Sequence, residues 1–309
     1  MKKIIFLSIL SIGTLYCCNP MLDDELFEKT VVFTKNGFQD MLIDYNSQEE
    51  TIAMLPVSIS GTTRNTENVH VKVALDTDTL NNYNFERFRN QTNLYYNLLP
   101  EDSYALSAQD VIIPNGSERV MLPIKLKPAK IDKLKDFVLP LRISETSSYS
   151  IGPNKYSKAL LRILFQNYFS GNYVVSGKVR DKTYNSEINL SSRTLKVVDE
   201  NTCYFYAGNI DPNSNLDINN KFIIMLHVNP DTKIVSLFAA DPAIELQPQT
   251  AKIETSINTD PQHNNTEITT LKITLKYTYK DITNTLSPPT MEFDGSMTLV
   301  KIKDTAKTE

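Results

Sequence analysis

Short runs rich in β-branched and aromatic residues, separated by turn-forming residues, recur along almost the whole chain. In the run Val69-His70-Val71-Lys72-Val73-Ala74-Leu75, the larger apolar residues occupy every second position. Side chains of a strand alternate between two faces, so this period of two predicts a strand with one buried face. The abundance of Asn, Thr and Ser fits polar loops between such strands. We therefore expect an all-β fold.

The first half of the chain favours an immunoglobulin-like β-sandwich over residues 29–166. Roughly seven short strands with turns between them, in about 140 residues, fit that architecture. Residues 81–99 are an exception, because they are polar and aromatic, and a short helix is expected there. The expected strands are residues 30–34, 51–59, 69–75, 111–113, 120–126, 137–143 and 159–165.

The second half favours a separate antiparallel domain over residues 167–304. A glycine turn at Tyr168-Phe169-Ser170-Gly171-Asn172-Tyr173 marks the expected boundary. About eight strands follow, which suit a small up-and-down barrel or a second sandwich. Residues 305–309 form a polar tail that is expected to fray. The expected strands are residues 173–180, 186–190, 194–198, 202–207, 222–228, 234–238, 267–280 and 291–302.

The start of the chain has the pattern of a lipoprotein signal. Lys2 and Lys3 precede an apolar run that is too short to span a bilayer, which needs about 20 residues. Leu15-x-x-Cys18 then places an apolar residue three positions before a cysteine. We expect a signal peptide at residues 1–17, lipid attachment at Cys18 and an acidic tether at residues 18–28. The alternative is a plain secreted protein with two stray cysteines.

Charge and cysteine content limit the partners. Loss of residues 1–17 would remove Lys2 and Lys3 from 32 basic residues and none of the 36 acidic ones, which leaves a formal charge of −6. This balance argues against a nucleic-acid partner. Cys203 would then be the one free thiol, so no intramolecular disulfide can form. Its strand-like surroundings predict a buried structural thiol rather than a nucleophile.

Three short motifs give the first half a family resemblance. They are Leu99-Pro100 followed by Tyr104, the turn Asn115-Gly116, and Leu139-Pro140-Leu141-Arg142-Ile143. This layout resembles a domain of unknown function found in Bacteroidetes lipoproteins of polysaccharide-utilisation loci. In some proteins that domain precedes a family-18 glycoside hydrolase. The matching residues are turn and core residues, so the resemblance implies a context rather than a site.

The same lipoproteins carry a lipocalin-like C-terminal domain, and the layout of residues 167–304 is similar to it. The resemblance thus implies an immunoglobulin-like sandwich followed by a lipocalin-like barrel. The run Asp23-Asp24-Glu25 resembles the export signal that sends such lipoproteins to the outer face of the outer membrane. The implied partners are a polysaccharide or oligosaccharide, the outer membrane, and a TonB-dependent transporter with its partner lipoprotein.

Catalytic residues are not expected. Glycoside hydrolysis needs two facing carboxylates, and the family-18 signature Asp-x-x-Asp-x-Asp-x-Glu is absent. Glu292 and Asp294 would share one face of a strand, where solvated acids are far commoner than a catalytic pair. We therefore do not expect an enzyme, although a hydrolase with an unrecognised carboxylate pair is one alternative.

Metal and cofactor sites are not expected either. The run from Asp211 to Asp217 begins like a calcium loop, but Leu216 stands where glycine is needed and Phe222 where a bidentate glutamate is needed. A polar loop is the favoured interpretation. The three histidines, His70, His227 and His263, lack metal-binding spacing.

Sugar binding requires aromatic platforms and polar side chains rather than a fixed motif. The chain has no Trp, so loop tyrosines are the available platforms: Tyr149, Tyr156 and Tyr184. Each also fits an ordinary strand-end tyrosine. The favoured hypothesis is a lipid-anchored surface protein that binds glycan for uptake. The alternative to it is a structural or adhesive protein of the fimbrial kind, which needs a donor strand from a neighbour.

Overall fold

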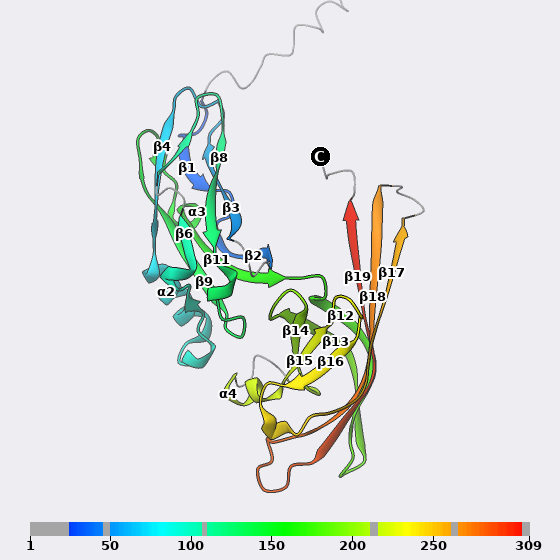
Figure 1. Ribbon diagram of the computed structural model, residues 1–309. Coiled ribbons are helices and arrows are strands. Elements are labelled where there is room, and N and C mark those ends of the chain that lie inside the picture. The colour runs from blue at the N-terminus through cyan, green and yellow to red at the C-terminus, as the bar shows by residue number, and fades with distance from the viewer. Residues whose placement is uncertain (1–24, 46–49, 107–109, 211–215, 261–264, 305–309) are drawn as a thin grey trace, which may run out of the picture.

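The computed structural model of the protein describes residues 25–45, 50–106, 110–210, 216–260 and 265–304. Two β domains follow one another along the chain (Figure 1). Two sheets form the N-terminal domain and one eight-stranded sheet forms the C-terminal domain, so the expected all-β fold is confirmed. The segment 1–17, Cys18 and the tail 305–309 lie outside the described residues.

The two sheets of the N-terminal domain enclose a single hydrophobic core. The first sheet has the order β10 (Ser150–Ile151), β1 (Thr30–Phe33), β3 (Thr51–Ser60), β8 (Arg119–Leu126) and β6 (Tyr104–Leu106). The second has the order β2 (Gly37–Asp44), β11 (Lys158–Gln166), β9 (Phe137–Thr146), β4 (Val69–Leu75) and β7 (Asp110–Ile113), with β5 (Asn97–Leu98) beside β9.

The period of two in β4 determines how this strand packs. Val69, Val71 and Val73 are buried in the core, whereas His70 and Lys72 are exposed on the opposite face. Burying an aliphatic side chain of this size contributes about 1.5–3 kcal/mol, so the alternation fixes which face of the sheet turns inward. The predicted strand and its predicted orientation are both confirmed.

β2 was not expected from the sequence. It forms an edge of its sheet and pairs in parallel with β11, from Gly37 opposite Ala159 to Asp44 opposite Gln166. Its inner face carries Met41 and Ile43, which pack on the core. The sequence did not predict this strand because two acidic residues interrupt its apolar pattern. In addition, its partner strand lies more than 120 residues further along the chain, so no local pattern indicates the pairing.

Short helical segments interrupt the strands. α2 (Thr77–Phe88) begins earlier than the expected 81–99 region, because the Asp76 side chain accepts a hydrogen bond from Thr79 N and caps the helix. The other α-helical segments among the described residues are α3 (Asn154–Ser157) and α4 (Leu216–Asn219). The 3₁₀ turns in the described part of the chain are Thr92–Leu94, Glu101–Ser103, Pro128–Lys130, Asn220–Phe222 and Pro242–Ile244.

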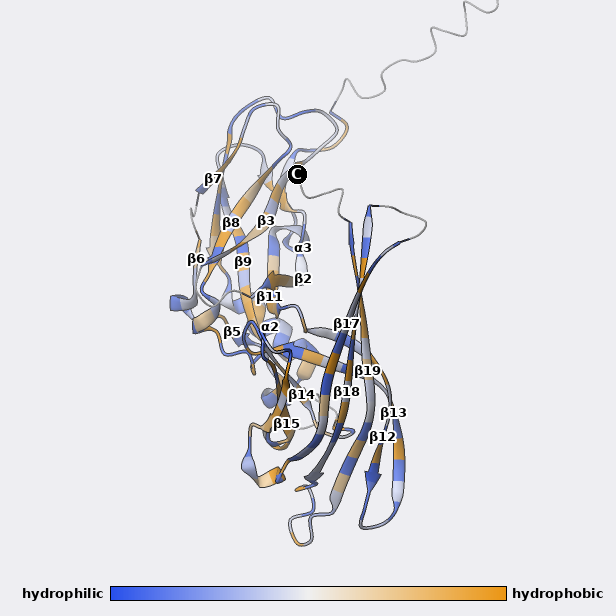
Figure 2. Ribbon diagram, turned by 45° about the vertical axis from the view of Figure 1, so that its right-hand side comes forward, coloured by the Kyte–Doolittle hydropathy of each residue, from blue (hydrophilic) through white to orange (hydrophobic). Residues whose placement is uncertain are grey.

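The C-terminal domain is a single antiparallel sheet that curls into a nearly closed barrel. Buried aromatic side chains fill its centre. Strand β15 is largely hydrophobic (Figure 2). The strand order of the sheet is β16 (Val235–Ala239), β15 (Ile223–Val228), β14 (Thr202–Tyr206), β13 (Ser186–Val197), β12 (Gly171–Asp181), β19 (Thr290–Asp304), β18 (Thr266–Lys280) and β17 (Gln247–Thr259). The aromatic residues of this core are Phe169, Tyr173, Phe205, Phe222, Tyr277, Tyr279 and Phe293.

Two details of this sheet differ from the sequence-based expectation. Residues 186–190 and 194–198 were expected to be separate strands, but they form the single strand β13. Strand β12 has one extra residue between Val174 and Gly177, and this bulge lets β13 continue through Ser191-Ser192. Strand β17 was missed, because its residues are mostly polar and exposed and its stability comes from the ladder to β18.

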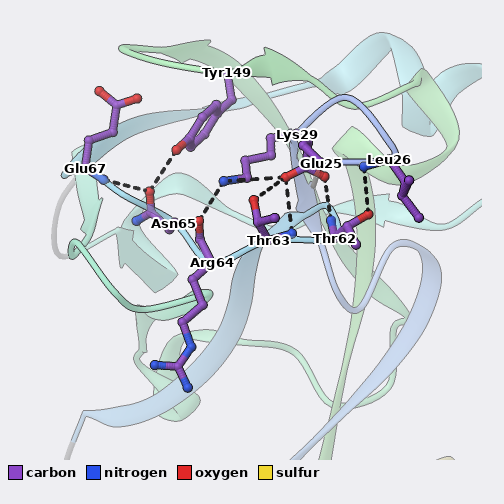
Figure 3. Close-up of polar contacts among 9 residues, drawn as sticks. All are labelled: Glu25, Leu26, Lys29, Thr62, Thr63, Arg64, Asn65, Glu67 and Tyr149. Carbon is purple, nitrogen blue, oxygen red and sulfur yellow. Dashed lines mark hydrogen bonds and ion pairs between the residues drawn. The ribbon is translucent and has the colours of Figure 1, made fainter. Parts of the chain in front are cut away.

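The start of the described chain is fixed to the N-terminal domain (Figure 3). The Glu25 carboxylate accepts hydrogen bonds from Thr62 N (2.6 Å) and from the Thr63 hydroxyl (2.6 Å), and Lys29 Nζ lies 3.5 Å away. The backbone N–H of Thr62 contributes most to lowering the pKa of Glu25 to about 2. Glu25, the last residue of the acidic run, is therefore bound to the turn after β3 rather than free.

No helix within the described residues has the length and apolar character needed to cross a membrane.

Candidate functional site

The three tyrosines proposed as sugar platforms do not form one site. Tyr149 is half-buried, so the expectation of an exposed loop residue is wrong for it. Its hydroxyl donates to Asn65 Oδ1 (3.1 Å), and Lys29 Nζ lies 5.4 Å from its ring centre (Figure 3). Its φ of +62° places it in a tight turn between β9 and β10. The Tyr149 side chain therefore packs against the end of the sandwich.

The other two proposed tyrosines are exposed but lie in different domains. Tyr156 is 42% exposed on the short α3 of the N-terminal domain, with Lys155 Nζ 5.4 Å from its ring centre. Tyr184 is 69% exposed in the turn between β12 and β13 of the C-terminal domain. Their role as ligand contacts stays a prediction.

The candidate carboxylates have structural surroundings. Glu292 and Asp294 share the outer face of β19, as expected, while Phe293 between them is buried. Glu292 lies 3.6 Å from Lys182 Nζ, and Asp294 lies 3.1 Å from Lys276 Nζ. Each carboxylate thus faces a lysine rather than a second carboxylate.

Cys203 and two of the histidines have local partners. Cys203 is fully buried, its thiol donates to Asn167 Oδ1 (3.3 Å), and burial raises its pKa to about 12. The predicted structural thiol is confirmed. His227 Nδ1 lies 3.0 Å from the Thr202 hydroxyl, and exposed His70 lies 3.6 Å from Asp110. His263 and the calcium-like residues 211–215 lie outside the described residues.

A groove of about 470 Å³ lies between the two domains and is the candidate binding site. A second groove of similar volume adjoins it. The two grooves share the lining residues Leu134, Asp136, Arg162, Thr194, Lys196 and Tyr204. We call the first the interdomain groove. Its N-terminal wall consists of Arg87, Phe88, Leu94, Tyr96, Leu134, Asp136 and Arg162. Its C-terminal wall consists of Leu190, Ser192, Arg193, Thr194, Lys196, Tyr204, Tyr206, Gly208, Asn209 and Ile210.

Aromatic side chains from α2 and the following segment build the N-terminal wall. The rings of Phe88 and Tyr96 meet edge to face, with centres 5.5 Å apart, and Phe38 lies 5.0 Å from Tyr96 on the other side. Phe38 also stacks on Tyr83 at 4.8 Å with nearly parallel planes. Aromatic pairs of this kind contribute about 0.5–1.5 kcal/mol beyond their buried area. The wall is therefore a rigid, half-buried aromatic surface.

An ion pair fixes a cation beside these rings. Arg162 Nε and Nη2 donate to the two oxygens of Asp40 at 2.7 and 2.8 Å. The guanidinium lies 5.7 Å from the Phe38 ring centre and 5.9 Å from that of Tyr96. The hydrogen bond to Asp40 contributes most to raising the pKa of Arg162, so the group is always charged. This bidentate geometry orients the guanidinium plane over the groove wall.

Two tyrosines and a buried arginine build the C-terminal wall. The rings of Tyr204 and Tyr206 lie edge to face, 6.1 Å apart, and burial raises the pKa of both phenols. Arg193, from β13, is 91% buried, as its exposed fraction is 9%. Its Nη2 donates to the Gly208 carbonyl at 2.6 Å and its Nη1 to the Tyr206 carbonyl, which ties β13 to the end of β14.

The junction between the domains is held by several hydrogen bonds. Lys301 Nζ donates to the carbonyls of Asn167 (3.0 Å) and Tyr168 (2.8 Å), and the Asn167 side chain donates to the Asp199 carbonyl (2.7 Å). The Tyr204 hydroxyl also donates across the interface to the Lys133 carbonyl (3.3 Å). These contacts order the linker between β11 and β12. We expect the groove to be largely preformed.

Both halves of the chain match family models. Residues 22–147 match a family described as a domain of unknown function, DUF4973, and residues 157–298 match the model of a C-terminal domain. No curated protein matches the chain. The first match agrees with the resemblance of the N-terminal half to a domain of unknown function.

Solved structures from Bacteroides share the whole two-domain architecture. A protein of unknown function from Bacteroides ovatus is 29% identical, with a TM-score of 0.81 over 91% of this chain and 97% of the other. A multidomain Bacteroides ovatus protein that includes DUF1735 is 27% identical, with a TM-score of 0.78 over 90% and 97%. An auxiliary nutrient binding protein from Bacteroides thetaiotaomicron is 26% identical, with a TM-score of 0.73 over 87% and 92%. The chain is a two-domain β protein similar to these Bacteroides proteins.

The interdomain groove combines ring faces with hydrogen-bonding groups. Phe88, Tyr96 and Tyr206 offer apolar ring faces. Lys196 offers a charged hydrogen-bond donor and Asp136 a charged acceptor. Its volume lies in the range of about 300–1,000 Å³ that is typical of small-ligand sites, which often occur at domain interfaces. The arrangement can hold a flat, amphipathic ligand without chemical change.

This site is not predicted from the sequence. Residues 81–99 are polar and aromatic, but this composition by itself indicates no function. The usable signal was the density of rings around a basic residue in this stretch, where Tyr83, Phe85, Phe88, Tyr95 and Tyr96 surround Arg87. The C-terminal wall had no such signal, because its residues alternate with core positions along β13 and β14.

Proposed function

We propose that the protein is an exported nutrient-binding protein that holds an oligosaccharide in the interdomain groove. The observation that carries the proposal is the convergence of aromatic and charged side chains from two domains on one groove of about 470 Å³. The similarity to an auxiliary nutrient binding protein supports it. The protein would retain its ligand reversibly and release it unchanged.

The physical fit to a sugar rests on two complementary surfaces. A pyranose ring has an apolar C–H face and a rim of hydroxyl groups. Phe88 and Tyr96 would pack against the apolar face, and Asp136, Lys196 and Asn209 would exchange hydrogen bonds with the rim. Because the aromatic wall is already packed, binding would freeze few side chains, which favours affinity.

The location of the protein is part of the proposal. A lipid on Cys18 would hold it on the outer face of the outer membrane, because each buried methylene contributes about 0.8 kcal/mol. It would then pass captured glycan to a TonB-dependent transporter and its partner lipoprotein. Labelling with radioactive palmitate, lost in Cys18→Ala, tests the anchor. Labelling that persists in this variant would contradict the lipid site.

Affinity electrophoresis and a glycan array with residues 19–309 test the binding function. We expect retardation by at least one class of polysaccharide, and loss of that retardation in Tyr96→Ala. Folding of the variant is checked by its urea midpoint. No retardation by any glycan, with a cooperative unfolding transition in the wild type, would contradict the proposal.

A further inference from the structure

The interdomain groove is positively charged in a protein whose formal charge is negative. The whole chain carries a formal charge of −4. Among the described residues, the groove is lined by four basic residues, Arg87, Arg162, Arg193 and Lys196, and by one acidic residue, Asp136, which gives these residues a formal charge of +3. Asp40, which pairs with Arg162, reduces the local charge to +2. Cations that converge in a concave site attract anions.

Arg193 is the most unusual of these cations. It is 91% buried, and the acceptors of its Nη atoms are backbone carbonyls, not carboxylates. Within the described part of the chain, its Nε has no hydrogen-bond partner. The rings of Phe205 and Phe293 lie 5.1 and 5.5 Å from the guanidinium carbon. Carbonyls and ring faces carry only partial negative charge, so among the described residues the Arg193 guanidinium has no full counter-charge.

Arg87 and Lys196 extend this charge to opposite walls of the groove. Arg87 lies on α2, exposed, with its Nη1 donating to the Tyr83 hydroxyl (3.0 Å) and its guanidinium 5.4 Å from the Phe88 ring centre. Lys196 lies on β13, opposite Tyr204 in the strand ladder. An anion between the two walls would face a cation on each side. Neutral sugars would gain nothing from this pairing beyond single hydrogen bonds.

We infer that the interdomain groove selects an anionic oligosaccharide, one whose sugar rings carry carboxylate or sulfate groups. The inference rests on the proposed function and names its ligand class. Ring faces would pack on Phe88 and Tyr96, and the anionic groups would lie toward Arg87 and Lys196, within the field of Arg193. Asp136 would repel an anionic group placed next to it. It would therefore limit which distances between the anionic groups of a ligand the groove accepts.

Matched pairs of acidic and neutralised glycans test the inference by isothermal titration with residues 19–309. One pair is a galacturonan oligomer and its methyl ester, and a second is a chondroitin sulfate oligomer and its desulfated, carboxyl-reduced form. We expect an acidic member to bind at least tenfold more tightly than its neutralised partner. Higher ionic strength should weaken the acidic member selectively, because screening shortens the reach of charges to about 10 Å at 0.1 M salt.

Charge variants locate the effect. Arg87→Gln with Lys196→Gln should weaken binding of the acidic member about five- to tenfold, while Asp136→Asn should strengthen it. Lys252→Gln, which removes an exposed lysine from β17, is the matched control and should change nothing. Urea midpoints check that each variant is folded.

The outcomes separate the inference from the proposed function. Neutral glycans that bind as tightly as acidic ones would overturn the anionic ligand class and leave glycan binding intact. Acidic binding that Arg87→Gln with Lys196→Gln does not weaken would overturn the role of this groove. Absence of binding to every acidic and neutral glycan would count against the proposed function itself.

Discussion

Asn84 and Tyr96 hold each other through two reciprocal hydrogen bonds. Asn84 Nδ2 donates to the Tyr96 carbonyl at 2.9 Å, and Tyr96 N donates to Asn84 Oδ1 at 3.0 Å. Asn84 is 97% buried, since its exposed fraction is 3%, so both bonds are shielded from water. One side chain of α2 thus fixes the backbone that places the Tyr96 ring on the groove wall.

Replacing this asparagine should affect stability and binding together. Asn84→Ala removes both hydrogen bonds, and we expect it to lower the free energy of unfolding by about 1–3 kcal/mol. It should also weaken glycan binding about as much as Tyr96→Ala, because the ring loses its fixed position. Urea unfolding and isothermal titration measure the two effects. Asn81→Ala, on the exposed side of α2, is the control and should stay within about 0.5 kcal/mol of the wild type. Equal stability of the two variants would refute this role of Asn84.

Glu25 should make the stability of the N-terminal domain depend on pH. Its pKa is lowered from 4.5 to about 2 in the folded protein, chiefly by the backbone N–H of Thr62. A carboxyl group with a lowered folded pKa stabilises the fold above its unfolded pKa and loses that contribution as the pH falls through the folded value. The urea midpoint of Glu25→Gln should therefore lie below that of the wild type near pH 7, and the gap should shrink between about pH 5 and pH 2.

The control for Glu25 is Glu118→Gln, which removes an exposed carboxylate just before β8. Its midpoint should follow that of the wild type over the whole pH range. A gap for Glu25→Gln that stays constant with pH would show that the carboxylate charge is not what stabilises this contact.

Gly295 and Gly177 allow β19 and β12 to approach closely in the barrel. They are partners in the strand register, and a Cβ on Gly295 would contact the Gly177 Cα and lie 2.7 Å from the Ser176 carbonyl oxygen. Backbone atoms cannot yield as a flexible side chain can. We expect Gly295→Ala to lower the free energy of unfolding by about 1–3 kcal/mol. Ser296→Ala, one residue further along β19, serves as the control in the same urea titration. A Gly295→Ala variant as stable as this control would mean that the strands can separate without loss.

Cys203 should be unreactive in the folded protein. The thiol is fully buried and its pKa is raised to about 12, so the reactive thiolate is scarce at pH 8. Residues 19–309 should release no thionitrobenzoate from Ellman's reagent under native conditions and should react fully in denaturant. Cys203→Ala gives the background in both conditions. Rapid reaction of the native protein would mean that the region around β14 opens locally.

The local sequence pattern was sufficient to predict strands that are stabilised by the burial of their own side chains. The alternation in β4 identified both the strand and its buried face, because each valine gains its own burial energy. β2 and β17 were not predicted. β2 is stabilised by a partner strand that is distant in the sequence, and β17 is stabilised by its hydrogen bonds to β18. β13 looked like two strands, because the bulge that keeps it continuous lies in β12.

The candidate site was out of reach for a different reason. Tyr149 looks like a loop tyrosine in sequence, yet the turn returns its ring to Asn65 and Lys29 of the sandwich. The interdomain groove joins Tyr96 to Tyr206, which are 110 positions apart in the chain. Only the packing of one domain on the other brings them together. The aromatic density of residues 83–96 was visible, but nothing in the sequence showed which surface would face it.

The most direct test of glycan binding in the interdomain groove compares single aromatic variants by isothermal titration with the glycan that binds the wild type. Tyr96→Ala removes a ring from the groove wall, whereas Tyr184→Ala removes a more exposed ring from the β12–β13 turn. We predict that Tyr96→Ala weakens binding at least tenfold and that Tyr184→Ala leaves it unchanged, with both variants folded. Loss of binding in Tyr184→Ala with full affinity in Tyr96→Ala would contradict the account and place the ligand at the far end of the barrel.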